Sequence, residues 1–429
     1  MRWKGLLLAL LAAAAVGGIA IGFSLGGSDA GTSSSSVAAG SLTAETADKG
    51  GTTVADESQT SPGHRLVVGT VDDALKQPDP ARAAELVRIS RQAGFDTVLV
   101  SSLWTPGSTS PSSAERLALR NVVRAAGREG LGVFVFVYHG LSANTPRTPS
   151  ARAQFAAYAA ALVRAFPQIR GVVVGNEPNL NTFWLPQFGP GGSDAAAAGY
   201  YALLAQTYDA LKAASPRIEV IGGALAPRGS DRPGLRRDTH SPTRFIKDLG
   251  ASYRTSGRTK PIMDAFALHP YMRLSAQPPS QTHAASTTIT IGDYAKLVSL
   301  LGRAFAGTPQ RGRDLPIYYT EFGVQTQVPQ GHRDAYTDLN SPAAADGVDP
   351  ATQARYYREA LELAACQPTV RGLFVWHTFD ERDLAGWQSG LYYADEKPKD
   401  SLRDFRDAAA AARDGSLTRC YGGTFVRTK

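Results

Sequence analysis

The sequence predicts an α/β fold, a (β/α)8 TIM barrel, on the basis of three observations. Short runs rich in β-branched and aromatic residues alternate with longer helical patterns rich in Ala, Leu and Arg. The short runs are hydrophobic on both faces, as strands are when helices cover both sides of a parallel sheet. Eight strand–helix units over about 350 residues fit a barrel with inserted loops.

Eight runs are predicted to form the strands, and a helical segment follows each of them. The strand-like runs are Leu66–Thr70, Thr97–Ser101, Gly132–Tyr138, Gly171–Gly175, Glu219–Gly223, Ala265–Leu268, Ile317–Thr320 and Gly372–Trp376. The helical segments begin near Pro80, Ser112, Ser150, Ser193, Ser241, Ile291 and Pro350, with a last one after Pro398. Several of these starts are Ser or Pro, which are favoured at helix N-caps and in first turns.

An open doubly wound sheet is the alternative to a closed barrel. Such a sheet usually carries a Gly-rich phosphate-binding turn after its first strand. Here the first strand is followed by Gly69-Thr70-Val71-Asp72-Asp73, which matches neither a dinucleotide-binding fingerprint nor a P-loop. The barrel is therefore favoured.

The chain is predicted to consist of an export segment, a linker, the barrel and a short tail. In residues 1–27, Arg2 and Lys4 precede a long apolar stretch, which indicates a signal peptide or a signal anchor. Residues 28–63 are rich in Ser, Thr and Gly and are predicted to be a disordered linker. The barrel takes residues 64–415 and the tail residues 416–429. Because the positive charges come first, the rest of the chain is predicted to be secreted or cell-surface, with membrane contact only through an uncleaved N-terminal segment.

Composition excludes several classes of protein. A chain of 429 residues with 43% hydrophobic and 19% charged residues is neither disordered throughout nor fibrous. The net charge of +7 is spread along the chain, which argues against nucleic acid as a partner. Cys366 and Cys420 are too few for a Cys-built metal site. Each ends or follows an outer helix, so export would permit a Cys366–Cys420 disulfide, with two buried free thiols as the alternative.

Polar residues follow five of the predicted strands at their carboxyl ends, where the functional residues of a barrel lie. They are Tyr138-His139, Asn176-Glu177-Pro178-Asn179, His269-Pro270-Tyr271, Glu321 and Trp376-His377. Glu177 and Glu321 thus face each other across the barrel mouth. Two opposed carboxylates are what glycosidic cleavage requires, one to protonate the leaving oxygen and one to meet the oxocarbenium carbon. Their surroundings are expected to separate the two pKa values, so that one is protonated and the other ionised near neutral pH.

These motifs resemble the signature of clan A of the retaining glycoside hydrolases. The closest patterns are those of the cellulase-like family five and the related family thirty-nine. The resemblance rests on Asn176-Glu177-Pro178 after the fourth strand and Glu321-Phe322-Gly323 on the seventh, and it covers about residues 64–415. It implies that Glu177 is the acid/base, Glu321 the nucleophile and Asn176 a ligand of the sugar 2-hydroxyl.

The resemblance also implies supporting roles in substrate binding. His139 and His269 match the polar residues on strands three and six, Tyr271 the tyrosine that holds the nucleophile ionised, and Trp376 the aromatic floor under the sugar. Family five usually places an arginine near the end of strand two, whereas here the strand ends Ser101-Ser102-Leu103-Trp104. Trp104 is expected to line the sugar cleft instead.

The sequence as a whole predicts an exported retaining O-glycoside hydrolase that acts on a polysaccharide or glycoside. It is expected to need no cofactor and no metal, since His139 and His269 lack the paired spacing of a zinc helix. The alternatives are a non-catalytic glycan-binding barrel and a transglycosylase that uses the same two glutamates. After strand eight, Asp380, Glu381, Asp383 and Trp387 form either a further sugar-binding wall or a solvated loop.

Overall fold

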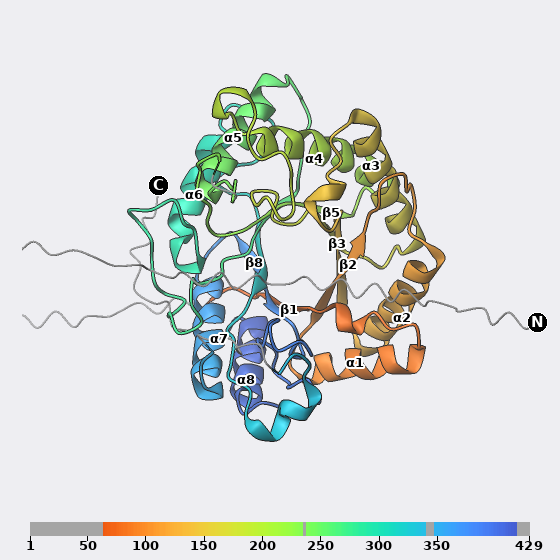
Figure 1. Cartoon of the computed structure of the whole chain (residues 1–429), viewed down its shortest axis with the longest axis vertical. Coiled ribbons are helices and arrows are strands. Elements are labelled where there is room, and N and C mark those ends of the chain that lie inside the picture. The colour runs from red at the N-terminus through yellow and green to blue at the C-terminus, as the bar shows by residue number, and fades with distance from the viewer. Residues whose placement is uncertain (1–62, 235–236, 340–346, 418–429) are drawn as a thin grey trace, which may run out of the picture. The chain divides into compact units, whose positions relative to one another are not determined.

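The computed structural model describes residues 63–234, 237–339 and 347–417. Within them, eight parallel strands form a closed barrel in chain order, each pairing with the next and the last with the first (Figure 1). The strands are β1 (Val67–Val71), β2 (Thr97–Leu103), β3 (Gly132–Tyr138), β4 (Gly171–Val174), β5 (Glu219–Leu225), β6 (Ala265–Leu268), β7 (Ile317–Phe322) and β8 (Val370–Trp376). The predicted (β/α)8 fold is confirmed.

A helix follows every strand, and the helices surround the barrel (Figure 1). They are α1 (Pro80–Gln92), α2 (Ser113–Glu129), α3 (Pro149–Ala165), α4 (Ala195–Ala214), α5 (Pro242–Thr255), α6 (Tyr294–Ala304), α7 (Pro350–Ala365) and α8 (Ser401–Asp414). Side-chain oxygens of Asp79, Ser112 and Thr148 accept hydrogen bonds from the first-turn amides of their helices, which explains these starts. The segment predicted to start at Ile291 begins as a short 3-10 helix, Ile291–Asp293, before α6.

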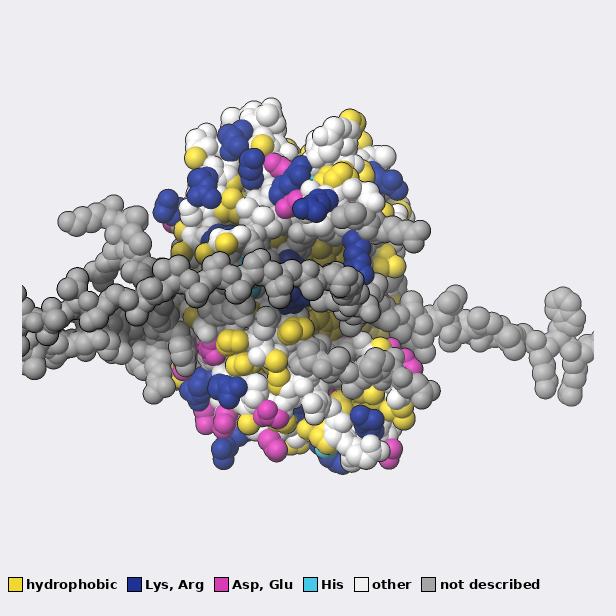
Figure 2. Space-filling model, turned by 60° about the vertical axis from the view of Figure 1, so that its left-hand side comes forward, with side chains coloured by type: hydrophobic (Ala, Val, Ile, Leu, Met, Phe, Trp, Pro, Cys, Tyr) yellow, Lys and Arg dark blue, Asp and Glu magenta, His cyan; other side chains and the backbone are white. Residues whose placement is uncertain are grey.

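The predicted export segment and nearly all of the predicted linker lie outside the described residues, as does most of the tail. In the part of the chain that the structure describes, no helix has the length and apolar character needed to cross a membrane. On the face drawn in Figure 2, Lys and Arg side chains form several separate groups.

The strands separate two hydrophobic cores. Side chains that point inward fill the barrel, and those that point outward pack under the helices. Inside, Phe134 contacts both Tyr318 and Phe374, with ring centroids 5.6 and 5.7 Å away. A Cβ atom at Gly69 would lie only 2.2 Å from the Phe374 ring, so the glycine provides the room for it. This packed interior supports the polar residues at the carboxyl ends of the strands.

Candidate active site

Glu177 directly follows the fourth strand in an unusual backbone conformation. Its φ is +38°, and its N–H donates a 2.8 Å hydrogen bond to the carbonyl of Ala224. Ala224 itself has a φ of +49° and lies where the pairing of β5 with β6 shifts register. Non-glycine residues with positive φ are strained and cluster at functional sites. The two irregular segments together fix where the Glu177 side chain begins.

Glu321 lies within a β-bulge near the end of β7. Tyr319 pairs with Leu373 and Phe322 with Val375, so three steps along β7 match two along β8. Tyr319 and Phe322 both belong to the outer core. The Glu321 carboxylate accepts a 3.1 Å hydrogen bond from the Tyr271 hydroxyl. Tyr271 is thus placed where the resemblance implies, against the predicted nucleophile.

His269 connects the two glutamates. Its Nδ1 lies 3.1 Å from Oε1 of Glu177 and 3.3 Å from Oε2 of Glu321, and the imidazole is fully buried. Burial alone would lower the pKa of His269, but the negative charges of Glu321 and Glu177 outweigh it and raise the pKa. The oxygens of the two glutamates and the His269 nitrogen all lie within 4.8 Å of one another. The structure therefore brings Glu177, Glu321, His269 and Tyr271 into one cluster.

The charge state of Glu321 depends on its neighbours. Burial raises its pKa to about 7; the positive charge of His269 opposes this, the negative charge of Glu177 adds to it, and the Tyr271 hydrogen bond lowers it. The sequence predicts an ionised nucleophile, whereas the pKa of Glu321 in this site is raised, which favours its protonated form. Its burial at the mouth of the barrel is the cause.

Asn176 and Trp376 border the cluster with polar atoms that lack protein partners. Asn176 precedes Glu177, and its Oδ1 is buried without a hydrogen bond to the described residues. Trp376 ends β8, packs against the barrel interior and leaves its Nε1 unpartnered among those same residues. The Nε2 of His269 is also buried and unpartnered within the described chain. Buried polar atoms usually have partners, so these three atoms are candidates for binding a polar ligand.

His139 is turned toward the loop that follows β4. Its Nε2 lies 2.6 Å from the carbonyl of Phe183, and its ring meets Trp184 edge-on at 5.6 Å. Burial lowers the pKa of His139 to about 4, so the ring is neutral and donates to that carbonyl. In this position His139 holds the β4–α4 loop in place.

Trp104 does not line the cleft, contrary to the sequence-based expectation. It is 1% exposed, its Nε1 donates to the Ser108 carbonyl at 2.8 Å, and its ring packs edge-on against Phe155 of α3. The reason is the alternation of the strand: Leu103 packs against the barrel interior, so the next side chain points outward under the helices.

The loop after β8 combines both roles that the sequence left open. The Trp387 ring packs against the Tyr271 ring in a tilted arrangement, with centroids 5.0 Å apart, which places an aromatic ring beside the cluster. Asp380, in contrast, forms a buried 2.7 Å ion pair with Lys399 and accepts a hydrogen bond from Tyr336. Trp387 therefore belongs to the wall of the site and Asp380 to the support of the loop.

The sequence assigned no role to two residues beside the site. His377 has a φ of +74°, and its ring lies 4.3 Å from that of Trp376. Arg228, on the loop after β5, donates from Nη2 to the Met272 carbonyl at 2.8 Å. The only sequence signal was for His377, which directly follows a predicted site residue. Arg228 contacts the loop after β6 from the loop after β5, and it belongs to no motif.

Glu177, His269 and Glu321 have the donor types and spacing to hold a metal ion, so the expected absence of a metal stays a prediction.

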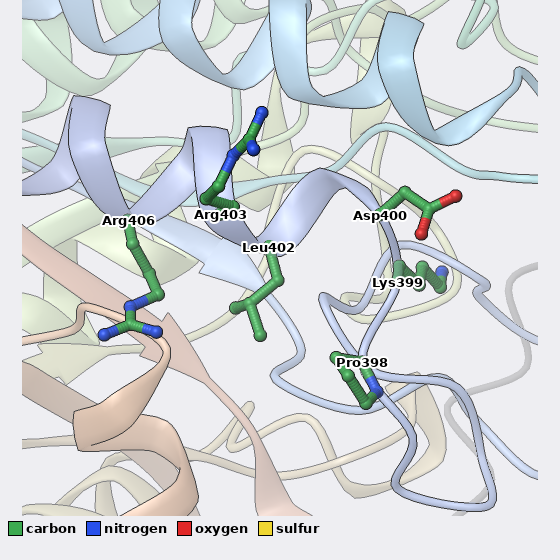
Figure 3. Close-up of a pocket in the computed structure, with 6 residues that line it drawn as sticks. All are labelled: Pro398, Lys399, Asp400, Leu402, Arg403 and Arg406. Carbon is green, nitrogen blue, oxygen red and sulfur yellow. The ribbon is translucent and has the colours of Figure 1, made fainter.

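A separate shallow pocket of about 410 Å³ lies at the start of α8 (Figure 3). Its lining is Pro398, Lys399, Asp400, Leu402, Arg403 and Arg406. Cys366 caps the C-terminus of α7 and is disulfide-bonded. Cys420 lies outside the described residues, so the pairing of the two stays a prediction.

No protein-family model and no curated protein matches this chain. Solved structures with a similar fold include GH5_18 from Streptomyces cattleya in complex with GlcNAc, with a TM-score of 0.54 and 17% identity over 82% of this chain and 81% of that one. They also include a GH39 β-xylosidase from Caulobacter crescentus, with a TM-score of 0.51 and 16% identity over 82% and 73% of the two chains. The virulence factor SghA from Agrobacterium tumefaciens has a TM-score of 0.53 and 14% identity over 82% and 98%. The chain thus shares its barrel fold with members of both families that its motifs resemble.

Proposed function

We propose that this protein is a retaining O-glycoside hydrolase in which Glu177 is the acid/base and Glu321 the nucleophile. The observation that carries the proposal is the pair of glutamates, with an oxygen of each within 4.8 Å of the other. Retaining enzymes hold their carboxyl groups about 5–5.5 Å apart, whereas inverting enzymes need a wider gap that admits a water molecule. The spacing therefore supports direct attack by one carboxylate.

Each role follows from the contacts of the two side chains. Glu321 attacks the anomeric carbon while Glu177 gives its proton to the leaving oxygen, and a glycosyl–enzyme ester forms. Glu177 then removes a proton from water, which attacks the same carbon and releases Glu321. The Tyr271 hydroxyl donates to Glu321 and stabilises its ionised form, which favours Glu321 over Glu177 as the nucleophile.

The unpartnered polar atoms around the pair support a carbohydrate as the substrate. Asn176 Oδ1 and Trp376 Nε1 offer an acceptor and a donor, and the Trp376 and Trp387 rings offer apolar surfaces for a sugar ring. Among the proteins of similar fold, GH5_18 binds GlcNAc and, as an E153A variant, Manβ1-4GlcNAc. We assign Asn176 to the sugar 2-hydroxyl and Trp376 to the floor of the site, with a polysaccharide or glycoside as the substrate. Export, by way of residues 1–27, is part of the same proposal.

A panel of aryl glycosides tests this function. We expect the protein to release phenol from at least one of them, and ¹H NMR of the first sugar formed should show the anomeric configuration of the substrate. Binding without turnover would indicate the non-catalytic glycan-binding barrel. Transfer of the sugar to an added acceptor in preference to water would indicate the transglycosylase. A first product of inverted configuration would contradict the mechanism.

The pH dependence of the reaction should reflect the state of Glu321. For an aryl glycoside that leaves without protonation, we expect kcat/KM to rise as the pH increases through about 7, because the raised pKa of Glu321 keeps it protonated and unreactive below that value. Tyr271→Phe removes a donor that favours the ionised form, so this acidic limb should move to higher pH. Glu177→Gln removes a negative charge that favours the protonated form of Glu321, so the acidic limb should move to lower pH. A limb that moves in neither variant would contradict the assignment.

A further inference from the structure

Arg228 occupies a position beside the catalytic cluster that the proposed reaction does not use. It lies on the loop between β5 and α5, and its Nη2 donates to the carbonyls of Met272 at 2.8 Å and Tyr271 at 3.4 Å. Tyr271 in turn donates its hydroxyl to Glu321. The guanidinium is therefore attached to the backbone of a residue that contacts the nucleophile.

The guanidinium is partly buried and makes no ion pair with a carboxylate in the described part of the chain. Both of its hydrogen bonds go to carbonyls and both come from Nη2, which leaves Nη1 and Nε for other acceptors. Burial lowers the pKa of Arg228, whereas the charge of Glu177 raises it. A charged group removed from water needs a partner, because its desolvation is costly.

Three of the other partly buried arginines have such partners. Arg258 donates to both carboxylate oxygens of Asp209, at 2.9 and 2.7 Å. Arg82 pairs with Glu85 and Glu396, and Arg244 pairs with Asp248. Arg228 has no such carboxylate among the described residues, so its guanidinium keeps donors for an anion beside Glu177.

The charges around Arg228 indicate on which side of the scissile bond that anion would lie. Its positive charge acts on Glu177, the proposed proton donor, and this carboxyl stands on the side of the leaving group. The positive charge of Arg228 thus lies beside the proposed proton donor, where it favours a negatively charged ligand.

We propose that Arg228 binds an anionic group, a carboxylate or a sulfate, on the leaving-group part of the substrate. This inference rests on the proposed glycosidase function and specifies its substrate class: glycosides whose leaving portion is acidic. The anion would accept hydrogen bonds from the free donors of Arg228 while Glu177 protonates the adjacent glycosidic oxygen. Arg228 is then a specificity-determining residue, separate from the two catalytic glutamates.

A matched pair of aryl glycosides provides the test. The sugar is the one that the panel identifies, and the leaving groups are 4-carboxyphenol and its methyl ester, which differ in charge at nearly the same size. We expect the wild-type protein to have a kcat/KM about tenfold higher for the carboxylate, as for a charge-assisted hydrogen bond. The preference should weaken as salt is added. The ester is the better leaving group, so chemistry alone would give the opposite order.

The variants isolate the contribution of the guanidinium. Arg228→Gln should reduce the ratio of the two kcat/KM values to about one or below, and Arg228→Lys, which keeps the charge, should retain part of it. Arg232→Gln on the same loop is the matched control, because Arg232 is exposed, and it should keep the wild-type ratio. Both substrates are measured on the same preparation, so any misfolded fraction cancels from the ratio. A third glycoside with 4-sulfophenol, whose sulfonate has the shape and charge of a sulfate, distinguishes the sulfate class from the carboxylate class.

The possible outcomes separate this inference from the proposed function. If the wild-type protein hydrolyses none of the panel, the glycosidase function itself fails. If it hydrolyses the ester but shows no preference for either anion, the function stands and the anion site is refuted. A preference that survives unchanged in Arg228→Gln would also overturn the assignment to Arg228.

Discussion

Glu321→Ala should abolish the hydrolysis of every glycoside that the wild-type protein cleaves, with a fall in kcat of roughly 10⁴-fold or more. Without the carboxylate, no glycosyl–enzyme ester can form on β7. Added azide should enter the space of the lost side chain and attack the anomeric carbon from the same face. The product would be a glycosyl azide of inverted configuration, identified by its ¹H coupling constants.

A surface glutamate supplies the control for this experiment. Glu85→Ala removes an exposed carboxylate on α1 that pairs with Arg82, so its kcat should match that of the wild-type protein. An azide product of retained configuration from Glu321→Ala would exchange the roles of the two glutamates. Undiminished hydrolysis by this variant would refute the glycosidase mechanism.

Glu177→Ala should separate substrates according to their leaving groups. For glycosides with poor leaving groups, kcat/KM should fall by roughly 10³-fold, because no group protonates the glycosidic oxygen. For a 2,4-dinitrophenyl glycoside, whose phenolate leaves unprotonated, kcat/KM should change by less than about tenfold. The ester with Glu321 would then accumulate, since the base that activates water is also missing. Azide should accelerate its breakdown and give a product of retained configuration.

The leaving-group series contains its own check. Wild-type protein and Glu85→Ala should show only a shallow dependence of kcat/KM on the pKa of the released phenol, and Glu177→Ala a steep one. Equal losses for all leaving groups would indicate that Glu177 positions the substrate and transfers no proton. An inverted azide product would make Glu177 the nucleophile.

The fold was predictable because buried parallel strands have a strong sequence pattern. Runs such as Gly132–Tyr138 and Ala265–Leu268 coincide with β3 and β6, since apolar residues on both faces and flanking turn residues define their ends. Boundaries were less predictable where polar residues belong to the strand. The run predicted to end at Thr320 continues to Phe322, because the chain stays in the sheet through Glu321.

Which side chains meet at the site was only partly predictable. Strand order brought Glu177, Glu321, His269 and Tyr271 together, because the carboxyl ends of neighbouring strands share one end of the barrel. The side to which Trp104 points follows from which residues of β2 face the barrel interior, and this was known only from the structure. The raised pKa of Glu321 likewise depends on how deeply the fold buries it. Arg228 depends on a contact between two loops, for which local sequence carries no pattern.

Because of the bulge in β7, the direction of the Glu321 side chain depends on the number of residues between Tyr319 and Phe322 as well as on their types. In a regular strand, Tyr319 and Phe322 would lie on opposite faces, since they are three residues apart. The extra residue lets both pack under the helices while Glu321 remains against Tyr271. Losing one residue between them would force a choice between an intact outer core and a carboxylate aimed at the substrate. The length of this segment is therefore constrained as strictly as the identity of Glu321 itself.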